Sequence, residues 1–130
     1  MSRERFVMKE KNGIKYFVFP HLEQTGLIVH GITTRFTGVS LPPYDSLNLA
    51  FHTGDDPEAV RENRKRLSLA LGFDFKDLVS CQQVHGTEGL RVDSHHRGCG
   101  SLEYGDSIPG TDGLLTTEQG IPLLMNYADC

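Results

Sequence analysis

The segment DDPEAVRENRKRLSLALGF constrains the fold more than any other part of this 130-residue sequence. Asp56 suits the N-cap of a helix, and Pro57 suits its first position, where a backbone N–H has no helical partner. Gly72 suits the residue after the helix, which often has a left-handed conformation. The apolar side chains that share one face are Val60, Leu67 and Leu71. The segment therefore predicts a helix from Pro57 to Leu71.

Apolar runs rich in β-branched and aromatic residues predict strands on both sides of this helix. Two such runs precede it, Ile14 to Pro20 and Gly26 to Arg35. Four follow it: Leu78 to Gly86, Gly89 to Ser94, a short strand that begins at Leu114, and, after a glycine-containing turn, a buried strand that ends at Cys130. Strands around one helix predict an α/β or α+β fold, in which helices pack on a mixed β-sheet. A chain of this length is expected to form one domain, residues 1–130.

Composition excludes several classes of protein. No apolar run approaches the roughly 18 residues that cross a bilayer, and the charged start lacks a secretory signal, so a cytoplasmic protein without membrane contact is expected. The net charge of −4 and pI of about 5.8 disfavour a nucleic-acid partner. The odd cysteine count, Cys81, Cys99 and Cys130, favours free thiols or metal ligands over a disulfide framework.

A basic cluster lies within the predicted helix. Arg61, Arg64, Lys65 and Arg66 could form a phosphate-binding patch. The alternative is a solvated helix face, on which Glu62 pairs with Arg66 four residues later. The solvated face is favoured, because aromatic residues do not alternate with the basic ones.

The best candidates for chemistry stand at the ends of predicted strands. His85 ends one strand and Cys130, beside Asp129, ends another. A cysteine and a histidine from distant segments can serve as nucleophile and base, or both can bind zinc. The tract with His95, His96 and Cys99 is a weaker metal candidate, because its glycine-rich loop offers little to hold the geometry.

The long segment between residues 36 and 56 is also a candidate for function, because a stretch without periodicity inside a domain is commonly functional. Arg35, Ser40 and Asn48 could present a guanidinium, a hydroxyl and an amide to a phosphate or to sugar hydroxyls. Alternatively, Ser40 and Asn48 tie the loop together through side-chain to backbone bonds. The residues alone leave both interpretations open.

Five motifs, in order, resemble the YfiH/YlmD family. They are TTRFTGVS, PYDSLNLAFHTGDDPEAVRENRKRL, QQVHG, TDGLLT and ADC, and they extend from about Gly26 to Cys130. The resemblance implies a YfiH-like fold that is incomplete at its C-terminus, corresponding to the N-terminal half of a family member. It also implies that His85 and Cys130 bind zinc. The family's third ligand is the histidine of an HAGWRG motif, which lies outside this sequence.

The family was once labelled polyphenol laccase and is regarded as a purine nucleoside phosphorylase with adenosine deaminase activity. The implied partners are phosphate and a purine nucleoside: adenosine, inosine, guanosine or methylthioadenosine. Arg35 is the candidate phosphate ligand, supported by Ser40 and Asn48. With the third ligand outside the sequence, the isolated 130-residue chain is expected to be inactive. Its unpaired strand edges are expected to allow self-association.

Other functions remain as alternatives. Cys130 could be the nucleophile of a Cys–His hydrolase, with His85 as its base. A copper-dependent polyphenol oxidase fits less well, because copper oxidases need several clustered ligands and the histidines here are few. A non-catalytic role in peptidoglycan editing, linked to bacterial relatives, is the third alternative.

Overall fold

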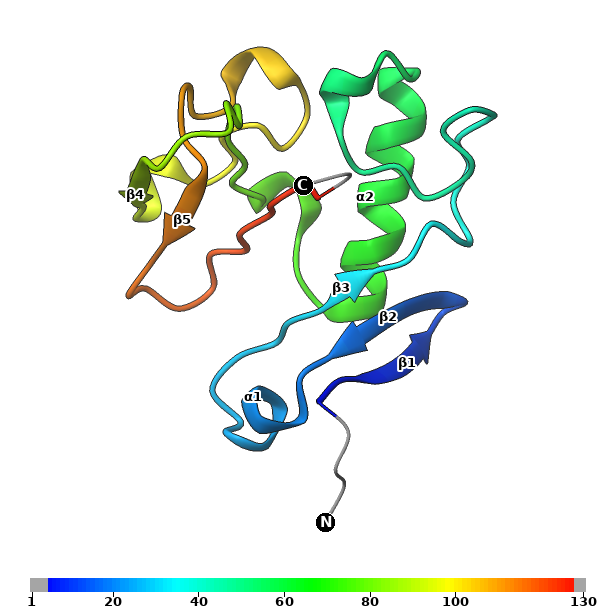
Figure 1. The fold of residues 1–130 in the computed structure, drawn as a ribbon, viewed down its shortest axis with the longest axis horizontal. Coiled ribbons are helices and arrows are strands. Elements are labelled where there is room, and N and C mark those ends of the chain that lie inside the picture. Colours follow the sequence, from blue (N-terminus) through cyan, green and yellow to red (C-terminus); the bar gives the residue numbers. More distant parts are fainter. Residues whose placement is uncertain (1–4, 128–130) are drawn as a thin grey trace.

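The computed structural model describes residues 5–127 and has a mixed α/β fold (Figure 1). Its helices and strands are β1 (Val7–Lys11), β2 (Ile14–Val18), α1 (Pro20–Gln24), β3 (Ile32–Thr33), α2 (Pro57–Leu71), β4 (Gly89–Arg91) and β5 (Gly113–Leu115). Short 3-10 helices span Phe51–Thr53, Phe75–Asp77, Ser94–His96 and Tyr104–Asp106. The predicted α/β class is confirmed; the antiparallel and parallel strands belong to separate sheets.

Helix α2 has the bounds that the sequence predicts. The Asp56 carboxylate accepts a 3.0 Å hydrogen bond from the N–H of Glu58, which caps the first turn. Gly72 has φ 85°, and its N–H donates to the Ser68 carbonyl at 2.8 Å. Both ends of the helix are therefore set by local side-chain and backbone chemistry.

Strands β1, β2 and β3 form an antiparallel sheet in that order. Strand β1 was not predicted from the sequence, and it pairs with β2 along its whole length. The turn between them is Asn12–Gly13, and both residues have positive φ, 51° and 80°. Such a turn matches the right-handed twist of paired strands.

The strand predicted from Gly26 to Arg35 is wrong in its extent. Only β3 is paired, with Tyr16 opposite Thr33 and Phe17 opposite Ile32. Continuing this register would place the preceding residues opposite α1, whose proline has no N–H to donate. The partner strand ends first, so the apolar residues before β3 stay unpaired.

The strands predicted after α2 are also shorter than expected. Between Leu78 and Gly86 only two isolated parallel bridges form, from Val79 to Leu123 and from Cys81 to Ile108. The strand predicted from Gly89 to Ser94 is present only as the shorter β4, which pairs in parallel with β5. Successive backbone groups here bond to different segments, so no single ladder extends. The strand predicted to end at Cys130 is described only as far as residue 127, with one bridge at Leu123.

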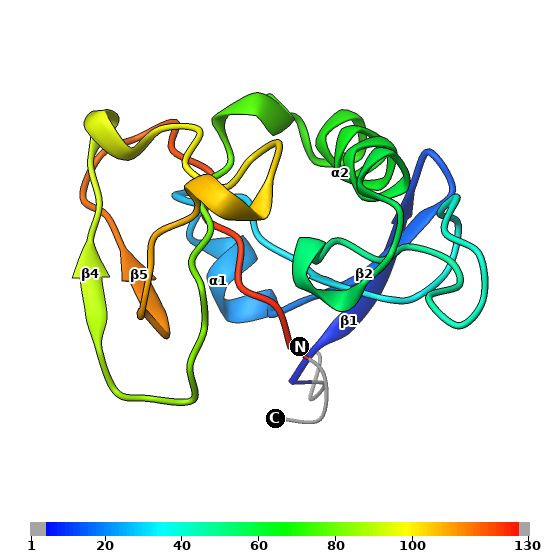
Figure 2. The ribbon, with the colours of Figure 1, turned by 90° about the horizontal axis from the view of Figure 1, so that it is seen from above.

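Two apolar clusters form the core. The first packs β2 against α2 and the loop around Leu47 and Leu49. The second surrounds the bridged residues Val79 and Cys81. Figure 2 shows α2 over β2 on one side of the molecule and the β4–β5 pair on the other. No helix among the described residues is long and apolar enough to span a bilayer.

Arg64 connects these two parts, and the solvated-face interpretation is wrong for it. Its side chain is buried, with the residue only 1% exposed. The guanidinium donates to the carbonyls of Leu49 at 2.9 Å and of Gly100 and Ser101 at 2.6 and 3.1 Å. It also lies over the Phe51 ring, 4.3 Å from the centroid. Burial lowers the pKa of Arg64 to about 10.

Candidate functional site

His85 lies in an exposed turn that follows the bridged segment. Its φ of 58° is left-handed, which is uncommon for a residue with a side chain. The carboxylate of Asp112 accepts hydrogen bonds from three successive N–H groups of the turn. Oδ1 accepts from Val84 and His85 and Oδ2 accepts from Gly86, all at 2.9 Å.

The segment approaching Cys130 runs parallel to the segment approaching His85. The N–H of Val79 donates to the carbonyl of Pro122, and the N–H of Leu124 donates to the carbonyl of Val79, both at 2.9 Å. Further along, the Sγ of Cys81 lies 3.6 Å from the Sδ of Met125. The two segments of the chain therefore stay side by side over several residues.

Gln83 and Asn126 extend this pairing toward His85. The Gln83 side-chain amide donates to the Asn126 carbonyl at 3.0 Å and accepts from the Asn126 N–H at 2.9 Å. Through these two hydrogen bonds, the side chain of Gln83 holds the backbone of Asn126 beside its own segment. Cys130 itself lies outside the described residues.

Ser40 and Asn48 meet at one carboxylate. Ser40 Oγ donates to Asp55 Oδ2 at 2.5 Å, and the Asn48 amide donates to the same oxygen at 3.1 Å. The Asn63 amide reaches in from α2 and donates to Ser40 Oγ at 2.9 Å. These side-chain contacts join separate parts of the loop, and the Asn48 amide also donates to the backbone carbonyl of Ala50 at 3.2 Å.

The hydrogen bonds also change the pKa of the Asp55 carboxyl. Its partial burial raises the pKa of the carboxyl, but the bonds from Ser40, Asn48 and the N–H of Asp56 outweigh that effect. The pKa of Asp55 therefore lies below its usual value. These bonds therefore stabilise the negative charge of Asp55.

Arg35 is held at a different point of this loop. Its guanidinium donates to the carbonyl of Asp45 at 3.0 Å and to the carboxylate of Asp45 at 3.1 Å. The side chain is 64% exposed, so this ion pair faces solvent. The structure thus brings Ser40 and Asn48 together at Asp55 and holds Arg35 against Asp45.

Local hydrogen bonds engage the two histidine rings of the competing metal candidate, the tract with His95, His96 and Cys99. The ring of His95 lies 3.1 Å from Asp93 Oδ1, and the His96 ring accepts the N–H of Asp93 at 3.1 Å. Cys99 packs against the second apolar cluster. These contacts stabilise the turn that Asp93 caps.

Within residues 5–127, no three side chains of His, Cys, Asp or Glu are grouped to hold a metal ion. His85 and Cys130 would supply an imidazole nitrogen and a thiolate sulfur, a donor set that fits zinc. The structure describes the backbone of the His85 turn, which Asp112 holds through the N–H of His85 at 2.9 Å.

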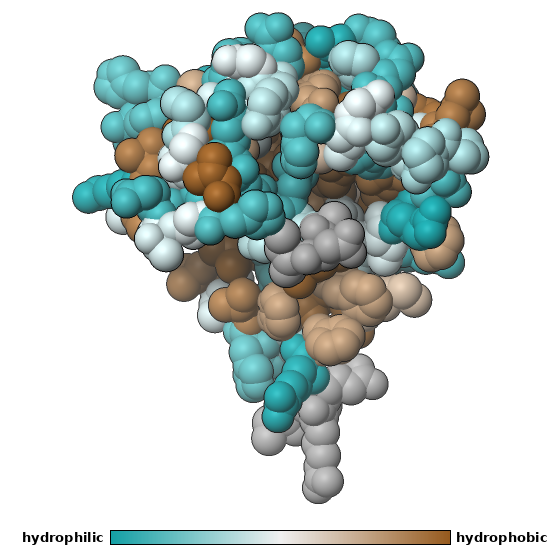
Figure 3. Space-filling view, turned by 45° about the horizontal axis from the view of Figure 1, so that its top comes forward, coloured by the Kyte–Doolittle hydropathy of each residue, from teal (hydrophilic) through white to brown (hydrophobic). Residues whose placement is uncertain are grey.

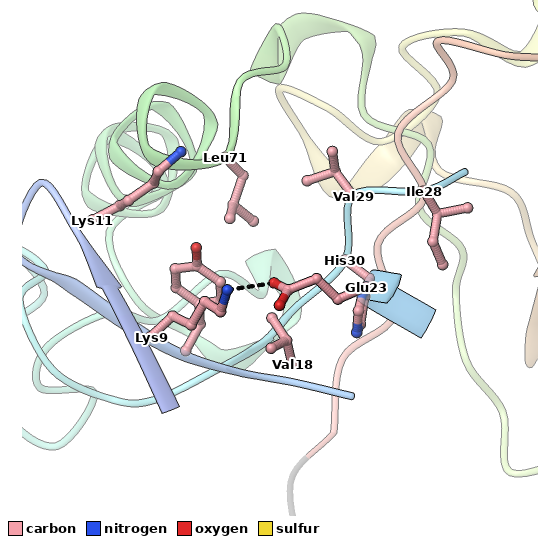
Figure 4. A pocket seen from close by; sticks show the side chains of 9 residues that line it. Lys9, Lys11, Val18, Glu23, Ile28, Val29, His30 and Leu71 are labelled. Carbon is pink, nitrogen blue, oxygen red and sulfur yellow. Dashed lines mark ion pairs between the residues drawn. The ribbon is translucent and has the colours of Figure 1, made fainter. Parts of the chain in front are cut away.

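A cavity of about 270 Å³ lies elsewhere, beside β1, β2 and α1 (Figure 4). Its lining residues are Lys9, Lys11, Tyr16, Val18, Glu23, Ile28, Val29, His30 and Leu71. Lys9 and Glu23 form an ion pair of 2.6 Å at its edge. The predicted site residues do not line it, so this cavity is separate from the His85 turn.

Residues 29–130 match the model of the family described as multi-copper polyphenol oxidoreductase laccase. The chain belongs to this family. The family description names copper, which associates the family with a metal. The YfiH/YlmD resemblance is confirmed by the relatives and solved structures that match the chain.

Purine nucleoside phosphorylase YlmD of Geobacillus stearothermophilus is 42% identical over 102 residues, 78% of this chain and 37% of the relative. Purine nucleoside phosphorylase YlmD of Bacillus subtilis is 33% identical over 103 residues, 79% of this chain and 37% of the relative. The chain therefore spans well under half the length of these relatives.

Two crystal structures share the fold. The structure of YlmD from Geobacillus stearothermophilus superposes with a TM-score of 0.75 at 42% identity, over 77% of this chain and 37% of that one. The structure of the hypothetical protein YfiH from Bacillus licheniformis superposes with a TM-score of 0.88 at 29% identity, over 98% of this chain and 45% of that one.

Asp112, Gln83 and Asn126 were not predicted as site residues from the sequence. Asp112 belongs to the TDGLLT motif, where an aspartate before a glycine is a common turn signal. Its partners lie more than 20 residues earlier in the chain, so spacing alone does not identify them. The Gln83–Asn126 pair spans 43 residues and has no local signal either.

Proposed function

We propose that this chain contributes His85 and Cys130 to the zinc centre of a purine nucleoside phosphorylase with adenosine deaminase activity. The observation that carries the proposal is the parallel pairing of the segments that lead to these two residues, from Val79–Leu123 to Gln83–Asn126. The names of the relatives support the reaction.

In phosphorolysis, a phosphate oxygen attacks the anomeric carbon of ribose while the bond to the purine nitrogen breaks. Arg35 is the proposed phosphate ligand, because its exposed guanidinium can exchange the Asp45 carboxylate for phosphate oxygens. Ser40 and Asn48 are proposed to support it. Direct contact with substrate would require them to exchange their bonds to Asp55, whereas holding the loop does not.

In deamination, water replaces the amino group of adenosine. Zinc, when bound, lowers the pKa of a water molecule toward about 7. The role proposed for His85 and Cys130 is to hold the ion, the imidazole through a ring nitrogen and the cysteine as thiolate. The substrate partners proposed are adenosine, inosine, guanosine or methylthioadenosine.

The test compares the 130-residue chain with a longer protein that carries the histidine of an HAGWRG-like segment. We expect phosphate-dependent release of hypoxanthine from inosine by the longer protein and none by the 130-residue chain, because two protein ligands hold zinc weakly. Release by the 130-residue chain alone would contradict the need for a third ligand. Failure of the longer, zinc-loaded protein to release hypoxanthine would contradict the phosphorylase.

The same preparations distinguish the alternatives. A Cys–His hydrolase would be active after zinc removal and would lose activity when iodoacetamide labels Cys130. A copper oxidase would oxidise phenols only after copper loading. A peptidoglycan-editing factor would keep its effect on the cell wall in His85→Ala.

Self-association and a cytoplasmic location complete the proposal. Several apolar side chains are exposed near β3, including Leu27 at 84% and Val29 at 75%. Figure 3 shows apolar side chains exposed below the mainly polar upper part of the molecule. Sedimentation of wild type and Leu27→Asp would test self-association, which the variant should reduce.

Cys81 and Cys99 are free, which is compatible with a reducing compartment such as the cytoplasm.

A further inference from the structure

Three successive backbone N–H groups of the His85 turn converge on the Asp112 carboxylate. The bonds from Val84, His85 and Gly86 are all 2.9 Å long. Bonds to an ionised carboxylate are stronger than bonds between neutral groups. A single side chain therefore fixes the backbone on both sides of His85.

The turn needs this support because of its conformation. His85 has φ 58°, a region disfavoured for residues with a Cβ. Gly86 is also close to the carboxylate, since a Cβ added there would lie 3.2 Å from Asp112 Oδ2. The backbone is thus packed tightly against Asp112, and a shift of the carboxylate would release the turn.

Asp112 is itself held by the backbone. Its N–H donates to the carbonyl of Glu88 at 2.9 Å, and the N–H of Thr111 donates to the carbonyl of Gln82 at 3.2 Å. The next residue, Gly113, begins β5, which pairs with β4. The carboxylate therefore acts from a firmly placed segment.

We propose that Asp112 is a positioning residue that holds the turn of His85 in the conformation in which its imidazole binds the metal. The inference rests on the proposed function, since it assigns Asp112 a role toward the same site. It acts through the backbone of His85, and so differs from a partner that bonds to the ligand's ring.

The test is Asp112→Asn, with Asp74→Asn as the matched control. Asp74 also accepts a backbone N–H, from Lys76, but in the loop after α2. In the metal-free chain, we expect Asp112→Asn to speed amide hydrogen exchange at Val84, His85 and Gly86. Zinc affinity of the longer protein that carries the histidine of an HAGWRG-like segment, measured against a chromophoric chelator, should fall about 10- to 100-fold, as for other groups that orient metal ligands. Asp74→Asn should change neither.

Each outcome separates the inference from the proposed function. If Asp112→Asn keeps the zinc affinity of wild type while His85→Ala loses it, the positioning role is overturned and the zinc site stands. If His85→Ala keeps the wild-type affinity, the proposed function fails instead. Should Asp112→Asn not fold, Gly86→Ala crowds the same carboxylate and should also weaken zinc binding. Unchanged affinity in that variant would overturn the inference.

Discussion

The buried guanidinium of Arg64 allows the sharpest prediction about stability. Arg64→Met replaces it with an unbranched apolar side chain that ends where the guanidinium begins. The carbonyls of Leu49 and Ser101 then lose their donor, whereas the Gly100 carbonyl keeps the hydroxyl of Ser80 at 3.2 Å. A buried acceptor left without a partner costs about 1–3 kcal/mol.

The two carbonyls left unpaired would cost about 2–6 kcal/mol if the costs added fully. Burying a cation is itself unfavourable, as the pKa lowered to about 10 indicates, and methionine avoids that cost. We therefore expect the free energy of unfolding to fall by about 2–4 kcal/mol, less than the full sum because methionine avoids the cost of burying the cation. This is a large part of the roughly 5–15 kcal/mol of a typical domain.

Urea unfolding followed by circular dichroism measures the effect, from the midpoint and slope of each transition. Arg66→Met is the matched control, because Arg66 lies on the exposed side of α2 in a 3.3 Å pair with Glu62. Its loss should cost no more than about 0.5 kcal/mol. If Arg64→Met were as stable as Arg66→Met, the view that Arg64 joins the two parts of the fold would be refuted.

Two further predictions follow from the loop before α2. The folded-state pKa of Asp55 is lowered, so its ionised form stabilises the fold above the ordinary pKa of 3.8, and this contribution is lost as pH falls below that value. Melting temperatures between pH 7 and pH 3 should therefore fall less for Asp55→Asn than for wild type; equal falls would contradict this role. Gly38→Ala places a Cβ 2.1 Å from the carbonyl oxygen of Ser46, whereas a Cβ at Gly105 meets no atom within 4 Å. Thermal unfolding should show Gly38→Ala clearly destabilised and Gly105→Ala nearly neutral, and equal melting temperatures would contradict the close packing of this loop.

Helix α2 could be predicted from the sequence because its signals are local. The N-cap Asp56, Pro57 and the terminal Gly72 lie within the element that they define. The strands were harder to predict, because a strand needs a partner elsewhere in the chain. The apolar run before β3 has strand-forming residues, but β2 ends before it could pair with them.

The surroundings of the candidate residues were also beyond a sequence argument. Arginine is a residue type that usually lies on the surface. The carbonyl partners of Arg64 nevertheless come from loops 15 and 36 or 37 residues away. Ser40 and Asn48 were recognised as loop residues, but their shared partner Asp55 was not. Local patterns identify candidates, whereas partners depend on the fold.

X-ray absorption at the zinc edge tests the central claim most directly, that His85 and Cys130 bind one metal ion. We expect the zinc-loaded protein to show one sulfur at about 2.3 Å and nitrogen at about 2.0–2.1 Å. Cys130→Ser should remove the sulfur signal, and His85→Ala should reduce the nitrogen signal. A spectrum without sulfur, or one that neither substitution changes, would contradict the account.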